Sequence, residues 1–523
     1  MSRAVRIVLE VLVLALAVWQ VVDVGAAMWT RLDANFDLEW MEGATLITGQ
    51  RAAAGLPFYT VPTADYIPFI YPPVYAWLLG VLSTVFPLGY TLGRSISIVG
   101  CVGTALALIA AARQEGARWP IAFGIGALFV GCYEESGTFY DLVRIDMLAM
   151  VSTAWALVLG RRAGNRAAVL SGVLLALGFA TKHNMAAFGL PILLWRLREY
   201  GRADALRFAA ASVVPALAFV VAMEVVTGGL FLRFLLEVPA QHGMVWTRAL
   251  PNVKAGKIDG AQAELVRALP VVVGVGLLTA WWWVRGAPGR YWAAHLGLGL
   301  VLVSAMRGHQ GGYLNVLIPM FWLMPIMLPL AEAALAGGSG WRCHLPLAFT
   351  ALLAVQLWEG RGNLERYLPT AADRRAAAEL IEELRGIDGP IAMPHAPWYP
   401  VLAGKEPSFA LIALWDIDHE GGPFYRASHA VDRALVNGRW AALVLPDDKL
   451  GHGLKNAYRR DRALKARTFR TRTGWGVKFG SVWTPMPKGA ERGRGRPPPS
   501  EEPEEEGSSA EDGGGAEEPS GGE

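Results

Sequence analysis

Long apolar runs separated by short polar stretches dominate the first two thirds of the chain. Each run approaches the roughly 20 apolar residues that a helix needs to cross a bilayer. Within the runs there is no one-sided helical periodicity of the kind that a soluble core imposes. The pattern therefore predicts an all-α polytopic transmembrane bundle of about 10–12 membrane helices. The clearest runs are Ile7 to Ala27, Ser95 to Ala112, Phe208 to Thr227, Leu269 to Val284 and Leu314 to Leu335.

The pattern changes beyond Glu359. An amphipathic helix is predicted from Ala371 to Leu384, and short apolar runs follow at Pro390 to Met393 and Ala441 to Leu445, separated by Gly- and Pro-bearing loops. After Pro487 no apolar residue is larger than Ala, so this stretch cannot bury enough surface to become ordered. We therefore predict a transmembrane domain at 1–360, a small soluble α/β domain at 361–486 and a disordered acidic tail rich in Gly, Pro and Glu at 487–523.

Composition supports a membrane protein. Hydrophobic residues make up 53% of the 523 residues and charged residues only 18%, whereas a soluble domain averages about a quarter charged. The net charge of +3 gives no reason to expect a nucleic-acid partner. Cys101, Cys132 and Cys343 lie in or beside apolar stretches without metal-ligand spacing, which indicates packing residues. Arg3 and Arg6 precede a run too long for a cleaved signal peptide, so we expect an uncleaved first helix.

The arginines predict the orientation, because Lys and Arg are enriched in cytoplasmic loops. The basic N-terminus and five later basic clusters, from Arg113 to Arg342, should face the cytoplasm. Between Arg166 and Arg196 the chain must then cross the membrane twice or not at all, and we expect a helical hairpin with Lys182 to Asn184 at its outer tip. We also expect a re-entrant or interfacial helix at Pro72 to Phe86, and a last crossing near 345–358 that delivers the α/β domain outside. The other segments predicted to lie outside are 28–70, Tyr140 to Asp146, 228–266 and Arg307 to Tyr313.

An acidic segment in the first outer loop is the leading candidate for chemistry. Asp37, Glu39 and Glu42 fall within six residues and alternate with large apolar side chains. Isolated charges at the membrane cost several kcal/mol, so their presence needs a reason. Such carboxylates can act as a general base toward a hydroxyl or bind a divalent cation. The alternative is an ordinary solvated loop.

A second candidate lies where an outer loop enters a helix. Asp141 and Asp146 near a helix start are favoured by capping and by the helix dipole, which is the structural explanation. Arg144 lies between them, at the membrane boundary, where a guanidinium can bind a phosphate with two hydrogen bonds. The functional and structural interpretations are evenly balanced for this segment.

Two basic segments complete the candidate site. Lys182 and His183 lie between two apolar halves of the predicted hairpin, where an ammonium group would suit a pyrophosphate. Arg307 and His309 lie beside glycines that let a backbone approach a ligand closely, and both could bind phosphate or a sugar. A single His is more often structural. All of these candidates are predicted to lie on one face of the membrane.

The order of these motifs resembles the GT-C glycosyltransferases of the protein O-mannosyltransferase and aminoarabinose transferase type. The resemblance covers roughly residues 1–335, and its motifs are short, so its specificity comes from their order and spacing. Those enzymes use polyprenyl-phosphate-linked sugars on the outer side of the membrane. The matching motifs are Asp37 to Gly43, Ala54 to Tyr59, Tyr71 to Tyr75, Tyr140 to Asp146 and Gly178 to Lys182.

The resemblance implies roles for individual residues. Asp37 is the first choice for the general base, with Glu39 and Glu42 close behind, and Asp146 matches the second acidic position. The resemblance also allows a divalent cation, Mg²⁺ or Mn²⁺, held by Asp37 and Asp146. The first loop has Asp-Leu-Glu in place of a compact Asp-x-Asp pair, which leaves open which carboxylate is catalytic and whether a metal is needed. The expected substrate-binding residues are Tyr71, Asp141, Arg144, Lys182, His183, Arg307 and His309.

The expected function is therefore sugar transfer from a polyprenyl-phosphate carrier to the hydroxyl of a lipid, glycan or protein acceptor, with inversion. We expect it in the inner membrane of a bacterium, among membrane lipids. A lipid or polysaccharide transporter or flippase without transferase chemistry is the main alternative. Transporters bind substrates near the bilayer midplane between repeated halves, and no internal repeat is evident here. An assembly or scaffold component without chemistry is a third interpretation.

Overall fold

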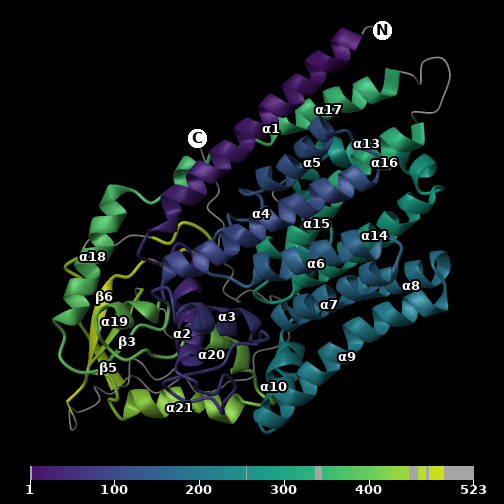
Figure 1. The fold of residues 1–523 in the computed structure, drawn as a ribbon. Coiled ribbons are helices and arrows are strands. Elements are labelled where there is room, and N and C mark those ends of the chain that lie inside the picture. The colour runs from purple at the N-terminus through teal and green to yellow at the C-terminus, as the bar shows by residue number, and fades with distance from the viewer. Residues whose placement is uncertain (1–2, 255, 336–343, 447–456, 467–469, 488–523) are drawn as a thin grey trace, which may run out of the picture.

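The structure is a computed structural model that describes residues 3–254, 256–335, 344–446, 457–466 and 470–487. Helices dominate up to residue 359, and a mixed α/β unit follows at one end of the helical bundle (Figure 1). The predicted tail beyond Pro487 lies outside the described residues. Arg342 and Cys343 also lie outside them. The two other cysteines, Cys101 and Cys132, are buried free thiols, which agrees with their prediction as packing residues.

Among the described residues, four helical segments are long and apolar enough to cross a membrane. A fifth arises if two helices that meet at a bend of 102° count as one broken span, α12 (Ala261–Ala268) and α13 (Pro270–Trp283). These segments coincide with the five longest apolar runs of the sequence. The four are α1 (Arg3–Leu32), α4 (Tyr90–Gln114), α9 (Arg202–Val226) and the segment Leu314–Leu335, which contains α15 (Ile318–Leu323) and α16 (Met327–Leu335).

Further helices complete the bundle. The helix predicted for the last crossing near 345–358 is present, and the Lys182 hairpin forms from two helices joined by a 3-10 turn at His183–Phe188. The further helices of the bundle are α5 (Trp119–Gly131), α6 (Asp146–Gly160), α7 (Asn165–Thr181), α8 (Gly189–Glu199), α14 (Ala287–Gly308) and α17 (Leu345–Glu359).

Glycines allow these helices to pack closely. A Cβ on Gly100 of α4 would lie 2.9 Å from the carbonyl oxygen of Met147 in α6. A Cβ on Gly172 of α7 would lie 2.7 Å from the carbonyl oxygen of Phe208 in α9. Small residues at such contacts let helix backbones approach one another, which is how helices associate in lipid. The packing of α6, which carries Asp146, and of α7, which leads to Lys182, is fixed in this way.

Two short helices follow α1 at the end of the bundle that carries the α/β unit. They are α2 (Glu42–Ala53) and α3 (Val74–Leu82), which pack against each other. With nine residues α3 is about 14 Å long, too short to cross a bilayer. This agrees with the prediction of a re-entrant or interfacial helix at Pro72 to Phe86.

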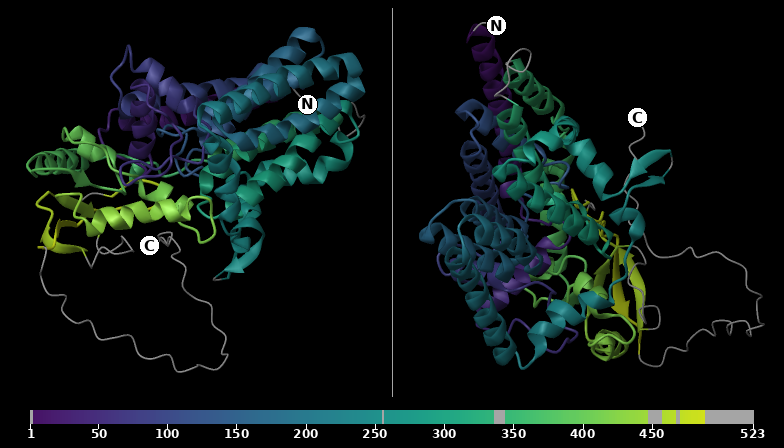
Figure 2. Two further views of the ribbon diagram at one scale, coloured as in Figure 1. Left: turned by 90° about the horizontal axis from the view of Figure 1, so that it is seen from below. Right: turned by 90° about the vertical axis from the view of Figure 1, so that its right-hand side faces the viewer.

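The predicted 228–266 outer segment contains only short elements before α12. These are α10 (Leu230–Leu232), α11 (Trp246–Ala249) and an antiparallel hairpin of β1 (Asn252–Lys254) and β2 (Lys257–Asp259). The hairpin stands away from the bundle in both views of Figure 2. Its apolar side chains Val253 and Ile258 are exposed.

The C-terminal unit contains a four-stranded sheet in the order β3-β4-β6-β5. Strands β3 and β4 are parallel, and the other two neighbouring pairs are antiparallel. The amphipathic helix and both strands expected from the sequence are present as α18, β3 and β4. Its elements are α18 (Ala371–Arg385), β3 (Ile391–Ala392), α19 (Trp398–Leu402), α20 (Leu411–Ile417), α21 (Tyr425–Val436), β4 (Ala442–Leu445), β5 (Tyr458–Ala463) and β6 (Ser481–Pro485).

Candidate active site

The acidic segment folds into a tight turn between α1 and α2 at the end of the bundle that carries the C-terminal unit. One oxygen of Asp37, Oδ1, accepts hydrogen bonds from the Gly43 amide and the Tyr90 hydroxyl, both at 2.8 Å. Burial, together with the nearby charge of Glu42, raises the pKa of Asp37 well above its usual range. Asp37 is therefore a buried carboxyl whose surroundings favour its protonated form.

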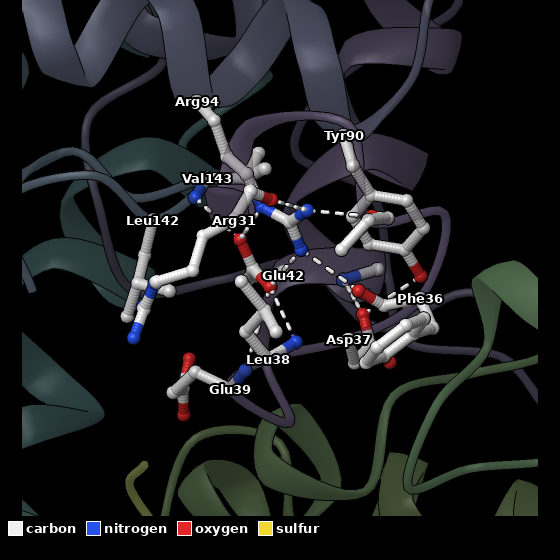
Figure 3. A network of polar contacts seen from close by, with 12 residues as sticks. Arg31, Phe36, Asp37, Leu38, Glu39, Glu42, Tyr90, Arg94, Leu142 and Val143 are labelled. Atoms are coloured by element: carbon white, nitrogen blue, oxygen red, sulfur yellow. Dashed lines mark hydrogen bonds and ion pairs between the residues drawn. The ribbon is translucent and has the colours of Figure 1, made fainter. Parts of the chain in front are cut away.

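Glu42 is held in a dense network around Arg94 (Figure 3). The guanidinium donates to both Glu42 oxygens, at 3.0 and 2.7 Å, and to backbone carbonyls that include those of Ala34 and Phe36. The amide of Val143 also donates to Glu42, at 2.9 Å. Burial alone would raise the pKa of Glu42, but Arg94 and the amide donors hold it below its ordinary value. Glu42 is thus an ionised group that joins three segments of backbone.

A second buried ion pair joins the end of α1 to the loop before α6. Arg31 Nε lies 2.8 Å from Oδ2 of Asp141, and both side chains are almost fully buried. Arg31 also donates to the hydroxyl of Thr138 at 3.1 Å. The carboxylate of Asp141, predicted to bind substrate, is therefore committed to Arg31.

Four of the predicted residues, from three segments, come together beside this framework. Arg144 Nη1 lies 3.4 Å from Oε2 of Glu39, and Arg144 Nε lies 3.8 Å from Oδ2 of Asp146. Lys182 Nζ lies 2.7 Å from Oδ1 of Asp146, which also accepts from Nδ2 of Asn315 at 3.0 Å. The side chain of Glu39 points away from the Arg94 network in Figure 3. We call Glu39, Arg144, Asp146 and Lys182 the charged cluster.

The charged cluster borders a small pocket with aromatic walls. Arg144 supplies its charge, and Tyr71, predicted to bind substrate, lies in its wall. Burial raises the pKa of Tyr71 to about 12, so the phenol stays a neutral hydrogen-bond donor. The remaining lining residues are Thr45, Thr48, Phe58, Phe69, Pro72, Tyr75, Ala76 and Ile145.

Two predicted binding residues have other partners. Arg307 ends α14 and forms an ion pair with Glu264 at 2.7 Å, and it also donates to the carbonyl of Gly312 at 3.0 Å. The ring of His309 lies 4.9 Å from that of His242, between centroids. The ring nitrogens of His309 lie 2.8 Å from the carbonyl oxygen of Gln310 and 3.3 Å from that of Pro239. His183 follows Lys182 in the chain. Its buried Nδ1 has no hydrogen-bond partner among the described residues.

The sequence reasoning missed two groups of residues. Arg31 and Arg94 could have been noticed, because each is an arginine at the end of an apolar helix, where a charge needs a partner. Asp416 in α20 carried no local signal. Its carboxyl is subject to the charge of Arg144 and in turn acts on Tyr71, so the C-terminal unit contributes to the site.

The side chains do not fit a resident divalent cation. Mg²⁺ and Mn²⁺ favour several oxygen ligands, and within the described residues no group of three or more His, Cys, Asp or Glu is arranged to hold a metal ion. Of the two predicted ligands, Asp37 already accepts two hydrogen bonds through Oδ1, and Asp146 is neutralised by Lys182. We therefore derive no chemical step through a metal.

The comparisons with known proteins agree with this geometry. Residues 69–306 match the model of glycosyltransferase family 87, a span that contains Tyr71, Arg144, Asp146 and Lys182. The fold is similar to that of ArnT from Cupriavidus metallidurans in the apo state, with a TM-score of 0.56 and 15% identity, covering 89% of this chain and 97% of that chain. The structure of ArnT bound to undecaprenyl phosphate gives a TM-score of 0.54 with the same identity and coverage. No curated protein matches this chain in sequence.

The family match and the shared fold support each other. The match covers the helices that carry most of the charged cluster, and the fold similarity extends over nearly the whole chain. The apolar helices make the chain an integral membrane protein. Residues 69–306 are thus similar to glycosyltransferase family 87, and the chain as a whole shares the fold of ArnT.

Proposed function

We propose that the protein transfers a sugar from a polyprenyl-phosphate carrier to an acceptor hydroxyl, with inversion at the anomeric carbon. The acceptor is a lipid, a glycan or a protein, and the reaction takes place at the extracytoplasmic face of a bacterial inner membrane. In this proposal the chain crosses the membrane ten to twelve times, and the end that carries the charged cluster and the C-terminal unit faces outward.

The observation that carries the proposal is the charged cluster beside an aromatic pocket at one end of the helical bundle. Arg144 and Lys182 supply two cations that can stabilise a lipid phosphate as it departs. ArnT, whose fold is similar, has been crystallised with undecaprenyl phosphate, which supports a polyprenyl-phosphate donor here. The polyprenyl tail would remain in the lipid while the sugar reaches the cluster.

In the proposed step the acceptor oxygen attacks the anomeric carbon from the face opposite the phosphate. The new carbon–oxygen bond forms as the bond to the phosphate oxygen breaks, and that oxygen leaves with the electron pair. A carboxylate accepts the proton of the acceptor hydroxyl. Arg144 and Lys182 compensate the negative charge that develops on the phosphate.

We propose Glu39 as this carboxylate, although the sequence favoured Asp37. Burial raises the pKa of Glu39 to about 7, with Arg144 acting in the opposite direction, and a pKa near the working pH suits a general base. Glu39 also lies beside Arg144, whereas Asp37 accepts a hydrogen bond from Tyr90 and has a pKa raised well above its usual range. Glu42 is ionised but both of its oxygens are taken by Arg94. A divalent cation is not needed for this step.

The test uses the purified full-length protein in lipid nanodiscs with undecaprenyl-phosphate-linked radiolabelled sugars. We expect release of undecaprenyl phosphate and transfer of label to an envelope extract. Glu39→Gln should reduce transfer by at least 100-fold while the protein remains folded, and Glu379→Gln on exposed α18 is the charge control. A Glu39→Gln variant that keeps transfer intact would contradict the assignment. Lipid movement across vesicles without transfer would instead favour the transporter.

A further inference from the structure

The C-terminal unit covers the acidic segment through its last loop. The amides of Arg472 and Thr473 donate to the carbonyl of Leu38 at 2.7 and 3.1 Å. Gly474 lies so close to Glu39 that a Cβ there would be 2.9 Å from Glu39 Cγ. The unit is therefore seated directly on the proposed base, and residues that it presents at this contact can reach the site.

Asp416 is the acidic residue that the unit presents. Its backbone carbonyl lies 3.0 Å from Nε2 of His242, which anchors the end of α20 against the segment that follows α9. Its carboxyl is subject to the charge of Arg144, and Tyr71 is subject to the charge of Asp416. Asp416 is therefore electrostatically coupled to Arg144 and Tyr71, two of the residues that line the pocket.

Within the described residues, the carboxyl of Asp416 has a single, long ion-pair contact. Its side chain is 15% exposed, and Nε2 of His242 lies 3.7 Å from its Oδ1. Glu42, Asp141 and Asp146, by contrast, each have a cation at 2.8 Å or less. The carboxyl oxygens of Asp416 can therefore still accept a hydrogen bond from a ligand.

An aromatic surface adjoins this carboxyl. Trp415 keeps 41% of its surface exposed. Its ring lies 5.8 Å from that of Trp40, which follows Glu39 in the chain, and 5.2 Å from that of Trp475. Trp40 and Trp475 pack edge to face at 4.9 Å and support it. An exposed ring on a rigid aromatic base offers a flat apolar contact at low entropic cost.

We propose that Asp416 and Trp415 form the acceptor subsite. The carboxylate of Asp416 accepts a hydrogen bond from a hydroxyl of the acceptor, and Trp415 packs against an apolar face of the same molecule. The C-terminal unit thereby selects the acceptor while the transmembrane part holds the donor phosphate. The inference rests on the proposed transfer function. No covalent bond changes at Asp416, which is a positioning residue.

The experiment separates acceptor binding from use of the donor. Purified full-length protein in nanodiscs receives an undecaprenyl-phosphate-linked radiolabelled sugar. Transfer to the lipid, glycan and protein fractions of an envelope extract is measured beside hydrolysis of the donor by water. Asp416→Asn and Trp415→Ala should lower the ratio of transfer to hydrolysis at least tenfold, with the KM for donor within twofold of the original. Asp416→Glu and Trp415→Phe should have a ratio of transfer to hydrolysis between that of the original protein and those of Asp416→Asn and Trp415→Ala.

Glu420→Gln, an exposed charge change three residues beyond α20, is the matched control and should leave the ratio unchanged. Equal losses of transfer and hydrolysis in Asp416→Asn, or an unchanged ratio, overturn the acceptor subsite. Hydrolysis by the original protein without transfer to any fraction also overturns it, while the donor half of the proposed function stands. Absence of both reactions in the original protein means instead that the proposed function has failed.

Discussion

Lys182 Nζ lies 2.7 Å from Oδ1 of Asp146, and this ion pair joins the end of α7 to the start of α6. Asn315 donates to the same oxygen, so a third segment is held at this point. Both charged side chains are more than nine-tenths buried. Removal of one partner from such a pair leaves an uncompensated charge, whereas removal of both does not.

Lys182→Met should therefore lower the free energy of unfolding by roughly 3–5 kcal/mol. The double variant Lys182→Met with Asp146→Asn should recover more than half of that loss, because it removes both charges together. Chemical denaturation in detergent, followed by tryptophan fluorescence, measures both values. Losses that simply add in the double variant would show that the two side chains are not coupled in the folded protein.

The network of Glu42 and Arg94 predicts a stability defect that is distinct from a catalytic one. Glu42→Gln weakens two charge-assisted hydrogen bonds from Arg94 and leaves its guanidinium without a counterion. We expect a loss of about 3–5 kcal/mol in the free energy of unfolding. Glu39→Gln should lose transfer with little loss of stability.

The comparison is made by thermal unfolding of both variants beside Glu379→Gln, an exposed change in α18. Equal stabilities of Glu42→Gln and Glu39→Gln would contradict the structural role of Glu42. Full transfer by Glu39→Gln would remove Glu39 as the base.

The sequence was sufficient for the architecture because lipid imposes a strong pattern. Each long apolar run became a helix, and Asp146 begins α6 as its position at the end of an outer loop indicated. The amphipathic pattern after Glu359 likewise predicted α18 within one residue of its end. These features depend on neighbours along the chain, which a single sequence displays.

Pairings between distant residues could not be read in the same way. Glu42 looked equivalent to Glu39, and only the position of Arg94, 52 residues on, separates a structural carboxylate from a candidate base. Asp416 lies 272 residues from Arg144 and belongs to no motif, so its place in the site depends on how the C-terminal unit packs. Arg307 carried the right chemistry but is paired with Glu264.

The pH dependence of transfer tests the protonation of Glu39. A base must be ionised, and burial raises the pKa of Glu39 to about 7, so kcat/KM should fall about tenfold per unit as the pH drops below 7. Arg144 opposes that rise, so Arg144→Gln should move the acidic limb to higher pH as well as slow the reaction. Initial rates between pH 5 and 9 measure the limb, and a flat profile over this range would contradict Glu39 as the base.

The raised pKa of Glu39 also predicts how the stability of the protein depends on pH. Its pKa is higher in the folded state than the ordinary value of 4.5, so the folded state binds the proton more tightly. The stability that the folded protein gains from this tighter proton binding is fully present below pH 4.5, and it is lost as the pH rises through about 7. Glu39→Gln should therefore stabilise the protein more at pH 8 than at pH 5, by about 3 kcal/mol in the difference. The free energy of unfolding of both proteins, measured at the two pH values, gives this difference. If Glu39→Gln changes stability equally at both pH values, the pKa of Glu39 is not raised.

The contact between α2 and α19 predicts a variant that disturbs the site from outside the charged cluster. A Cβ on Gly43 would lie 2.7 Å from Cβ of Trp398 and 3.1 Å from Oδ1 of Asp37. The Cβ of Trp398 is fixed to its backbone and cannot rotate away, so Gly43→Ala must shift α19 away from α2. We expect a loss of about 1–3 kcal/mol in stability and a clear fall in transfer, because the C-terminal unit that covers Glu39 is displaced.

Gly25→Ala provides the matched control, since a Cβ at this position of α1 meets nothing within 4 Å. Ala is favoured over Gly inside a helix by up to about 1 kcal/mol, so this variant should be neutral or slightly stabilised and fully active. A cysteine pair that links the unit to the acidic segment, at Leu38 and Thr473, reports displacement by a slower rate of crosslinking. If Gly43→Ala crosslinks and transfers sugar as readily as Gly25→Ala, the close seating of the C-terminal unit on the acidic segment is not required for the reaction.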